Sequence, residues 1–571
     1  MIQSRRRKEK NIKKYSEKEK RTIELAKIAW AKTLKEFYYP PLNDPNYIFD
    51  YIHLEGFYID PEHQWQITMN LANTPLLKED QEYIDYFYII SLHEVSHYQI
   101  IPYDGLINAK LLRVAMKHVN QNYAPIVVNI FADLIIDTKL YQKFPNLIEW
   151  EMIETYKHIT SKGSISHFSK FLFRAYEKMW NKDILGDEAL KEMDPLAERI
   201  TKIILKDFED ESTWEKKVSQ VAKLLNSLIQ DTFTLIGTRG IIDKNKEKRK
   251  SPGGAFVEFP KDVLEIMDNP LENKNADKLR EGNLDDLQQK SEEFAKDIPY
   301  SEFGGPARQA GILIDGNALA TWYRGLAKNL IEIKIYEEKP GGQLPIFPEV
   351  WRIGDRIEEL DIIQSLLNSP VIIPNITTRK WAYEEGPGHL VEKQVPDLLI
   401  VLDSSGSMKW SYTSRSIRGK GPYHTALVAA FASLHYAAKK GAKFSIINFS
   451  NRADICQWTS DYKKAEKVLL RYQGGGTFLP IKEIASQCEK AERNALVFII
   501  TDFGIYNWSK AKKIMINLAQ KGHKIIGFFI GSTRIPKEKF KNLLDKVKFY
   551  GIENPKDLIN LVIKEVHDNY S

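Results

Sequence analysis

Cysteine is scarce in this chain, since only Cys456 and Cys488 occur among 571 residues. This number excludes a disulfide framework and a zinc site built on thiolates, so any zinc must be held by histidine and carboxylate. The sequence also lacks an apolar run of about eighteen residues, the length that a membrane-spanning helix needs. Its first residues are charged where a secretory signal would need an apolar core, and we therefore expect a cytoplasmic protein without a membrane segment.

Positive charge is concentrated at one end of the chain. Residues 1–21 contain ten Lys or Arg and three Glu, a net charge of +7, whereas the whole chain carries +6, so the remainder carries −1. This basic tail has a single aromatic residue, Tyr15, and its glutamates are interleaved as on a solvated helix. A solvated N-terminal helix is therefore favoured, and nucleic-acid binding is the weakest interpretation of the chain.

The spacing of apolar residues predicts a multidomain protein. Helical spacing from residue 22 to 237 predicts a mainly α domain. Residues 238–306 are rich in charge and in helix-breaking residues and predict a charged linker. Residues 307–395 predict a mixed α+β connecting module, in which the alternation from Ile331 to Ile335 favours a strand. After residue 396, strand-length apolar runs alternate with helical stretches, which predicts a C-terminal α/β domain with a parallel sheet over 396–571.

Oxygen-bearing side chains follow three of these predicted strands. Asp403, Ser405 and Ser407 follow the first strand, Thr477 follows a run of three glycines, and Asp502 ends a later strand. Loops at the carboxyl ends of parallel strands converge, so these side chains are expected to meet. Hydroxyl and carboxylate oxygens suit Mg²⁺ or Mn²⁺. The alternative is that the first three residues form only a strand-ending turn, because their types favour turns.

The same pattern resembles the von Willebrand factor type A domain, whose metal-ion-dependent adhesion site combines DxSxS, a Thr after a glycine-rich turn and an Asp that ends a strand. The resemblance covers about residues 396–567 and implies a Rossmann-like fold. It also implies that Ser405, Ser407 and either Thr477 or Asp502 contact the ion directly, with the remaining residues acting through water. An Asp or Glu of a partner protein would complete the coordination shell.

A second metal pattern of different chemistry lies at residues 93–97, which read His-Glu-Val-Ser-His. On a helix, His93 and His97 lie one turn apart on one face, so both imidazoles can reach one Zn²⁺. Glu94 would then be directed toward the water that it activates. The flanking residues 83–92 are apolar and aromatic and favour a helix.

A catalytic zinc needs a third protein ligand, and the apolar run from residue 129 to 137 offers candidates. Asn129, Asp133 and Asp137 share one helical face, and acids on an apolar helix are costly unless something pairs with them. We predict Asp133 as a ligand and Asp137 as the acceptor that orients a ligand imidazole. His118 is the alternative third ligand. A second alternative is that the aspartates satisfy both histidines without metal.

Residues 26–140 resemble the metallopeptidase domain found N-terminal to certain von Willebrand-like domains, in which HExxH is followed by an Asn-x-x-Ala-Asp helix. The resemblance implies a zincin-like domain in which Glu94 is the general base for attack on a carbonyl. Two functions remain open at this point. One is a zinc-dependent peptidase whose C-terminal domain recruits a protein through its cation, and the other is a non-enzymatic adaptor in which zinc only braces the helical domain.

The stretch that leads into the C-terminal domain indicates a partner. Residues 351–355, with Leu360, Asp361 and Ser365 after them, resemble the corresponding stretch in companions of MoxR-like AAA+ ATPases. The resemblance implies such an ATPase as the partner. The chain itself has no GxxxxGKS or GxxxxGKT loop, so nucleotide-driven work would come from another protein.

Overall fold

The structure is a computed structural model of the whole chain. It describes residues 15–37, 44–51, 57–60, 66–97, 99–102, 105–236, 248–250, 256–264, 266–267, 284–313, 316–334, 344–384, 395–408, 412–413, 416–417, 421–502, 504–530, 543, 547–552 and 555–570. Most of the predicted basic tail and much of the predicted linker lie outside these residues. The chain divides into two compact units, Met1–Leu326 with Ser411–Gly419, and Ala327–Trp410 with Lys420–Ser571.

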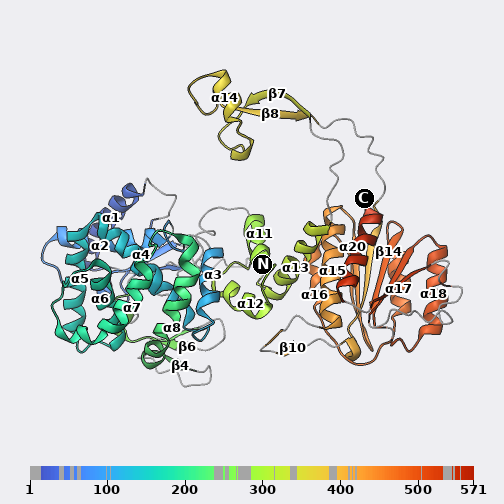
Figure 1. Ribbon diagram of the computed structural model, residues 1–571, viewed down its shortest axis with the longest axis horizontal. Helices are drawn as coiled ribbons and strands as arrows, with labels where there is room; N and C mark the ends of the chain where they lie inside the picture. Colours follow the sequence, from blue (N-terminus) through green and yellow to red (C-terminus); the bar gives the residue numbers. More distant parts are fainter. Residues whose placement is uncertain are drawn as a thin grey trace, which may run out of the picture. The chain divides into compact units, whose positions relative to one another are not determined.

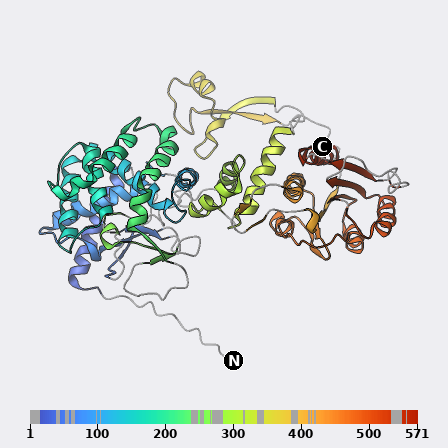
Figure 2. The ribbon, with the colours of Figure 1, turned by 60° about the horizontal axis from the view of Figure 1, so that its bottom comes forward.

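The first unit is mainly helical (Figures 1 and 2). Its longer helices are α1 (Glu17–Glu36), α2 (Asp80–His97), α3 (Gly105–Ala115), α4 (Ala124–Lys143), α5 (Pro145–Thr160), α6 (His167–Trp180), α7 (Asp194–Leu205) and α8 (Trp214–Thr232). Two small sheets accompany them, in the orders β1-β3-β2 (Asn46–Ile48, Gln66–Asn70, Phe57–Asp60) and β4-β6-β5 (Thr234–Ile236, Phe256–Glu258, Lys248–Lys250).

Helix α4 lies at the centre of this unit, where it contacts α2, α3, α5, α6 and α8. Every residue from Ala124 to Ile136 is buried, as expected for a helix that is apolar on all sides. Asn129 and Asp133 are the polar residues of this otherwise apolar stretch, and both are 3% exposed. The burial of a carboxylate in such a helix requires a partner for its charge. Because α2 packs directly on α4, the HExxH residues face these polar groups.

Part of the predicted linker is helical and packs on the first unit. Helices α11 (Leu284–Ala295) and α12 (Tyr300–Gln309) both contact α3, and the Gln309 side chain donates to the Gln121 carbonyl at 2.8 Å. The next helix, α13 (Ala318–Lys334), includes four of the residues predicted as a strand. That prediction was wrong because the helix begins thirteen residues earlier with good helix formers and continues through the alternating isoleucines. The first unit extends to Leu326, within α13.

The connecting module consists of an antiparallel ribbon, β7 (Leu344–Val350) and β8 (Arg379–Glu384), and the short helix α14 (Ile362–Asn368). The Trp351 indole donates to the Arg356 carbonyl, and the Trp381 indole donates to Asp361, both at 2.9 Å. Ten large aliphatic side chains of this module are exposed, namely Ile353, Ile357, Ile362, Ile363, Leu366, Leu367, Val371, Ile372, Ile373 and Ile376. Such a concentration on a small module is typical of a protein interaction surface.

The C-terminal region is built on a six-stranded mixed sheet in the order β13-β12-β9-β14-β15-β16. The strands are β9 (Asp397–Asp403), β12 (Phe444–Phe449), β13 (Ala453–Thr459), β14 (Ala495–Thr501), β15 (Lys524–Ile530) and β16 (Lys548–Ile552). All are parallel except the edge strand β13. Counted along the chain, this is the 3-2-1-4-5-6 order of doubly wound sheets, whose switch point lies between β9 and β14.

Helices cover both faces of this sheet (Figure 1). One face carries α15 (Pro422–Lys439), α16 (Tyr462–Leu469) and α20 (Pro555–Tyr570), and the other carries α17 (Ile481–Lys490) and α18 (Trp508–Gln520). Strands β9, β12 and β14 are buried along their whole length, as parallel strands covered on both faces should be. The ligand-binding edge of such a sheet is therefore the carboxyl end of β9 and β14.

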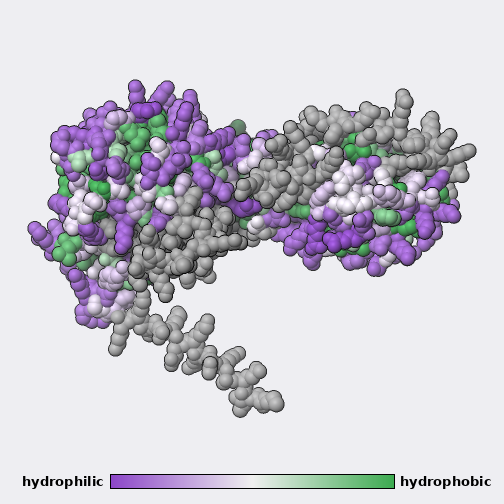
Figure 3. All heavy atoms as spheres, turned by 90° about the horizontal axis from the view of Figure 1, so that it is seen from below, coloured by the Kyte–Doolittle hydropathy of each residue, from purple (hydrophilic) through white to green (hydrophobic). Residues whose placement is uncertain are grey.

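Among the described residues, no helix combines the length and apolarity needed to cross a membrane. The face seen in Figure 3 is largely hydrophilic where the structure describes it, and its apolar residues lie in small groups.

Candidate metal centres

His93 and His97 lie on the last turns of α2, and each uses one ring nitrogen to fix its orientation. The Nδ1 of His93 lies 2.6 Å from Asp137 Oδ1, and the Nδ1 of His97 lies 3.0 Å from the Ile101 carbonyl oxygen. Because both of these partners are acceptors, each Nδ1 carries the proton and donates it. The two Nε2 atoms lie only 3.2 Å apart. With neither of them protonated, both would present lone pairs at the same point, as ligand imidazoles do.

Asp133 brings a third acceptor to the same point. Its Oδ1 lies 3.3 Å from His97 Nε2 and 3.6 Å from His93 Nε2, while its Oδ2 accepts a hydrogen bond from the Asn129 amide at 2.8 Å. Oδ1 is buried and makes no hydrogen bond within the described residues. Ligand atoms at about 2.0–2.1 Å from a tetrahedral zinc are separated by about 3.3 Å. The three donor atoms match that spacing, so the residues present fit a zinc ion.

The electrostatics of the pocket favour a cation. Burial lowers the pKa of His93, but the Asp137 and Asp133 carboxylates outweigh this effect and hold the pKa well above its ordinary value. Burial raises the pKa of Asp133, but its contacts with both imidazoles outweigh this effect and leave the pKa below its usual range. Buried carboxylates and facing imidazole lone pairs repel one another unless a proton or a metal ion lies between them.

Two further groups surround Asp137 and were not found from the sequence. Burial, together with the Asp137 and Asp133 carboxylates, raises the pKa of Tyr176 on α6 well above its ordinary value, so its hydroxyl keeps its proton. Burial and the charge of Asp137 raise the pKa of Glu151 on α5 to about 7. Both come from helices that only the tertiary fold brings to α4, and no local pattern in the sequence marks them.

The remaining predicted residues of this centre are distributed as follows. Glu94 follows His93 directly on α2 and is 3% exposed. Three donors converge, from His93, His97 and Asp133. His118 is not among them, because its Nε2 lies 2.8 Å from the Ser219 hydroxyl, between α3 and α8. The alternative third ligand is therefore not at the site.

The second predicted set lies at the switch point of the C-terminal sheet. Asp403 ends β9 and is fully buried; its Oδ1 accepts from the Ser405 backbone at 2.8 Å and its Oδ2 accepts from the Thr501 hydroxyl at 2.5 Å. The Ser405 and Ser407 hydroxyl oxygens lie 3.2 Å apart. Thr501, at the end of β14, was not predicted from the sequence, although its position directly before Asp502 could have indicated it.

Thr477 and Asp502 approach each other at the same edge. A Cβ built on Gly504 would lie 3.5 Å from Asp502 Oδ1 and 3.8 Å from Thr477 Oγ1, so both oxygens adjoin the same small space. Thr477 is buried, whereas Asp502 is partly exposed and Ser407 is exposed. A site formed by these residues would therefore be open to solvent on one side.

Backbone hydrogen bonds hold the three loops together. The Gly406 amide donates to the Gly475 carbonyl, and the Gly474 amide donates to the Ser404 carbonyl, both at 2.8 Å. The Tyr506 amide donates to the Thr477 carbonyl at 3.0 Å. Gly474 and Gly475 have φ of +69° and +87°, a region that glycine enters at little cost. The glycine run thus allows the tight turn that presents Thr477.

The donor set of the second centre consists only of oxygen. Burial raises the pKa of Asp403 to about 6, hydrogen bonds from Thr501 and Ser405 oppose this rise, and the charge of Asp502 adds to it. A buried carboxylate near a partly exposed one favours a divalent cation, and hydroxyl oxygens beside them suit Mg²⁺ or Mn²⁺ rather than zinc. The residues present therefore fit a hard cation.

An exposed aromatic pair lies at the rim of this centre. Phe478 and Tyr506 are 50% and 73% exposed, and their ring centroids are 5.3 Å apart. Each directly adjoins a loop of the centre, because Phe478 follows Thr477 and Tyr506 bonds to it. Exposed aromatic side chains beside a polar site favour contact with another protein.

We expect purified protein to contain about one zinc ion per chain, and the changes His97→Ala and Asp133→Ala to abolish it, because each removes one of three protein ligands. Inductively coupled plasma mass spectrometry measures the metal. His118→Ala is the matched control and should retain zinc, with circular dichroism verifying the fold of each variant. Full zinc occupancy in Asp133→Ala would contradict the assignment.

Magnesium should stabilise the protein more at pH 7.5 than at pH 5. Without a cation, the raised pKa of Asp403 means that its stabilising contribution is complete below about pH 4 and is lost as the pH rises through about 6. This loss amounts to about 2–3 kcal/mol, which bound Mg²⁺ offsets. Thermal unfolding with and without Mg²⁺ measures the difference. Asp403→Asn should remove the response to Mg²⁺, and an equal response at both pH values would argue against this account.

Comparison with known proteins gives little beyond the geometry. No family model and no curated protein matches the sequence. Part of this chain is similar to several solved structures, among them the conserved hypothetical protein BatB of Bacteroides thetaiotaomicron (16% identity, 30% of this chain and 99% of that chain, TM-score 0.23), an aerotolerance-related membrane protein of Bacteroides fragilis (16%, 30% and 99%, TM-score 0.22) and the pilus adhesin SpaC of Lactobacillus rhamnosus GG (12%, 31% and 31%, TM-score 0.25). Neither a family nor an activity follows from similarities of this size.

Proposed function

We propose that this chain is a two-metal protein in which an N-terminal zinc centre hydrolyses peptide bonds and a C-terminal von Willebrand factor type A-like domain binds a partner protein through Mg²⁺. One observation carries the proposal. Two imidazole Nε2 atoms and one carboxylate oxygen converge within 3.6 Å of one another, and the helix that carries both histidines also carries the buried Glu94. Three protein ligands leave a tetrahedral zinc one position for water or substrate, as in catalytic sites.

At the N-terminal centre, different residues would bind the ion, orient its ligands and transfer protons. His93, His97 and Asp133 would hold the ion, while Asp137 and the Ile101 carbonyl orient the two imidazoles. Bound zinc would supply Lewis acidity toward a substrate carbonyl and would lower the pKa of water. Glu94 would accept the proton of the attacking water and deliver it to the departing amine.

At the C-terminal centre, the domain assignment is supported by the strand order and by the place of the oxygen donors. Asp403, Ser405, Ser407, Thr477 and Asp502 all follow strand ends or the glycine turn at the switch point. The solvent-open side leaves room for an Asp or Glu of a partner protein as a further ligand. The exposed Phe478 and Tyr506 would then contact apolar side chains near that acid.

A second candidate function is that of a non-enzymatic adaptor for a MoxR-like AAA+ ATPase. The observation that favours it is the group of ten exposed aliphatic residues on the connecting module, which has the character of a protein interaction surface. The side chains of His97 and Asp133 are only 2% and 4% exposed, which also suits a zinc ion that braces the fold. In this case the metal would be retained without turnover.

The change Glu94→Gln separates the two functions. If the centre is a peptidase, this substitution should lower the rate of peptide hydrolysis by about 10²–10⁴-fold, because it removes the general base and keeps the ligands. Hydrolysis of a fluorogenic peptide library measures the rate, and zinc content should equal that of the unchanged protein. Equal hydrolysis by both proteins, or none in the zinc-loaded unchanged protein, would contradict the peptidase and favour the adaptor.

The change Asp403→Ala tests the C-terminal function. Affinity capture from native lysate in the presence of Mg²⁺ should recover a partner protein that is lost in this variant and in EDTA, because both remove the cation. Asp557→Ala, which changes an exposed aspartate on α20, is the control and should retain the partner. Recovery that is unaffected by Asp403→Ala and by EDTA would rule out docking through the metal.

A further inference from the structure

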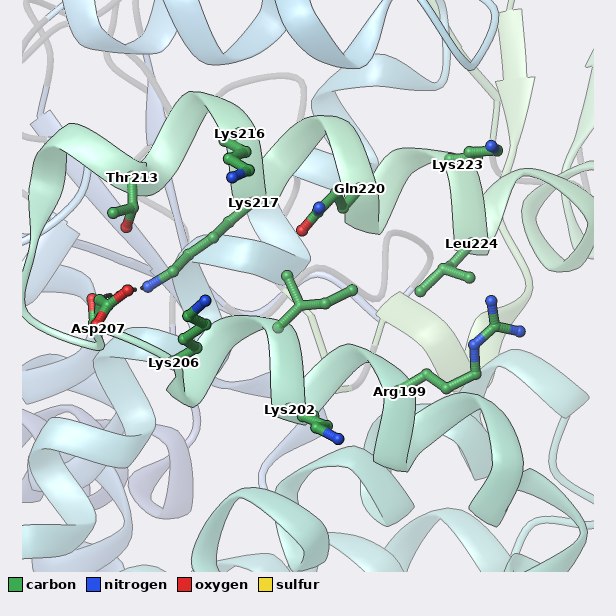
Figure 4. A pocket seen from close by; sticks show the side chains of 11 residues that line it. Arg199, Lys202, Lys206, Asp207, Thr213, Lys216, Lys217, Gln220, Lys223 and Leu224 are labelled. Carbon is green, nitrogen blue, oxygen red and sulfur yellow. Dashed lines mark hydrogen bonds between the residues drawn. The ribbon is translucent and has the colours of Figure 1, made fainter.

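A cationic groove lies between α7 and α8, remote in sequence from the residues of both metal centres. Its volume is about 570 Å³. Figure 4 shows the lining side chains on two neighbouring helices, with Arg199 and Lys202 on α7, Lys206 directly after it, and Lys216 and Lys223 on α8. All five of these cationic side chains are exposed. The spacing of i and i+3 on α7, and of i and i+7 on α8, directs both pairs toward the groove.

The described part of the chain does not neutralise these five charges. None of them forms an ion pair with a described residue, whereas Arg174 and Lys178 on the adjacent α6 both bind Asp194. Asp207 is the only acidic residue in the lining. Five like charges around one groove repel one another, and a bound anionic group would relieve that repulsion.

The two helices are held in a defined hairpin by a sixth, buried cation. The Lys217 ammonium donates to the Ile204 carbonyl at 3.1 Å and to the Asp207 carbonyl at 2.9 Å, and so satisfies the C-terminal end of α7. Figure 4 shows Lys217 directed toward Asp207 at one end of the groove. The rows of exposed charges therefore keep a fixed spacing without any ligand, which lowers the entropy cost of binding.

The shape and floor of the groove indicate the kind of anion. Ile203 and Leu224 provide apolar contact between the rows of charge, and Gln220 provides an amide. Seven residues of helix span about 10 Å, so each row matches about two turns of a partner helix. The lining contains no aromatic residue, which single-stranded nucleic acid would need for base stacking.

We propose that this groove binds an acidic amphipathic helix of a partner protein. Leucine-type side chains of that helix would pack on Ile203 and Leu224, and its acidic residues on both flanks would pair with the two rows of lysine and arginine. Binding here is independent of zinc and magnesium, because no residue of the groove belongs to either metal centre.

The test uses the full chain and a fluorescein-labelled synthetic peptide of about four helical turns, with glutamate on both flanks of a leucine stripe. Fluorescence anisotropy should show saturable binding that weakens at least about tenfold between about 50 mM and about 500 mM salt, because the contacts are ionic. The double change Lys202→Glu and Lys223→Glu should weaken binding by a further factor of about ten or more. Lys510→Glu with Lys513→Glu, on the exposed face of α18, is the matched control and should bind as the unchanged protein does.

A shuffled peptide of the same composition, without helical periodicity, should bind at least about tenfold more weakly, because it cannot present leucines and glutamates on separate faces. Equal binding of the shuffled peptide would contradict recognition of a helix, since the groove would then recognise charge alone. Tighter binding of a single-stranded oligonucleotide or of inorganic polyphosphate would also overturn the proposal. So would equal affinity of the groove variant and the control variant, since the site would then lie elsewhere.

Discussion

The first unit is organised around two imidazoles and a carboxylate that meet at one buried point. Two ring nitrogens and a carboxylate oxygen lie together between α2 and α4, and α4 is otherwise almost entirely apolar over its buried part. Such an arrangement is costly unless a cation compensates it. Each of the three side chains is oriented by a hydrogen bond: Asp133 by Asn129, His93 by Asp137, and His97 by the Ile101 carbonyl. The packing of two helices alone does not require side chains to be oriented so precisely. We therefore propose a metal at this point rather than histidines that are satisfied by aspartate alone.

In the second unit, the topology of the sheet determines where the site lies. When the chain crosses from one side of β9 to the other, the loops after β9 and β14 must diverge, and polar side chains there are not covered by helices. Asp403 and Asp502 stand at this point, and backbone bonds from the glycine turn bring Thr477 to them. The two proposed metal centres thus differ in donor type as well as in their place in the sequence, with imidazole at one centre and only oxygen at the other.

Short spacing let the sequence predict which groups share a helical face. The four-residue interval between His93 and His97, and the same interval between Asp133 and Asp137, place groups on one helical face whatever the tertiary fold. Apolar runs predicted the four parallel strands β9, β12, β14 and β15, but not the edge strands β13, which is antiparallel, and β16. The sequence could not predict long-range packing. No local pattern marks Tyr176 on α6 as a neighbour of the site. The isoleucines after residue 330 continue a helix, although they alternate as in a strand. Whether α11 and α12 form a linker or pack on α3 likewise depends on contacts far apart in sequence.

The central claim is that zinc is bound by two imidazoles and a carboxylate at the α2–α4 contact. X-ray absorption at the zinc edge of the purified protein tests it most directly. We expect a first shell of about four nitrogen or oxygen atoms at about 2.0–2.1 Å, with the outer-shell scattering of two imidazole rings and no sulfur. A shell that contains sulfur, or one with more than two imidazoles, would contradict the account.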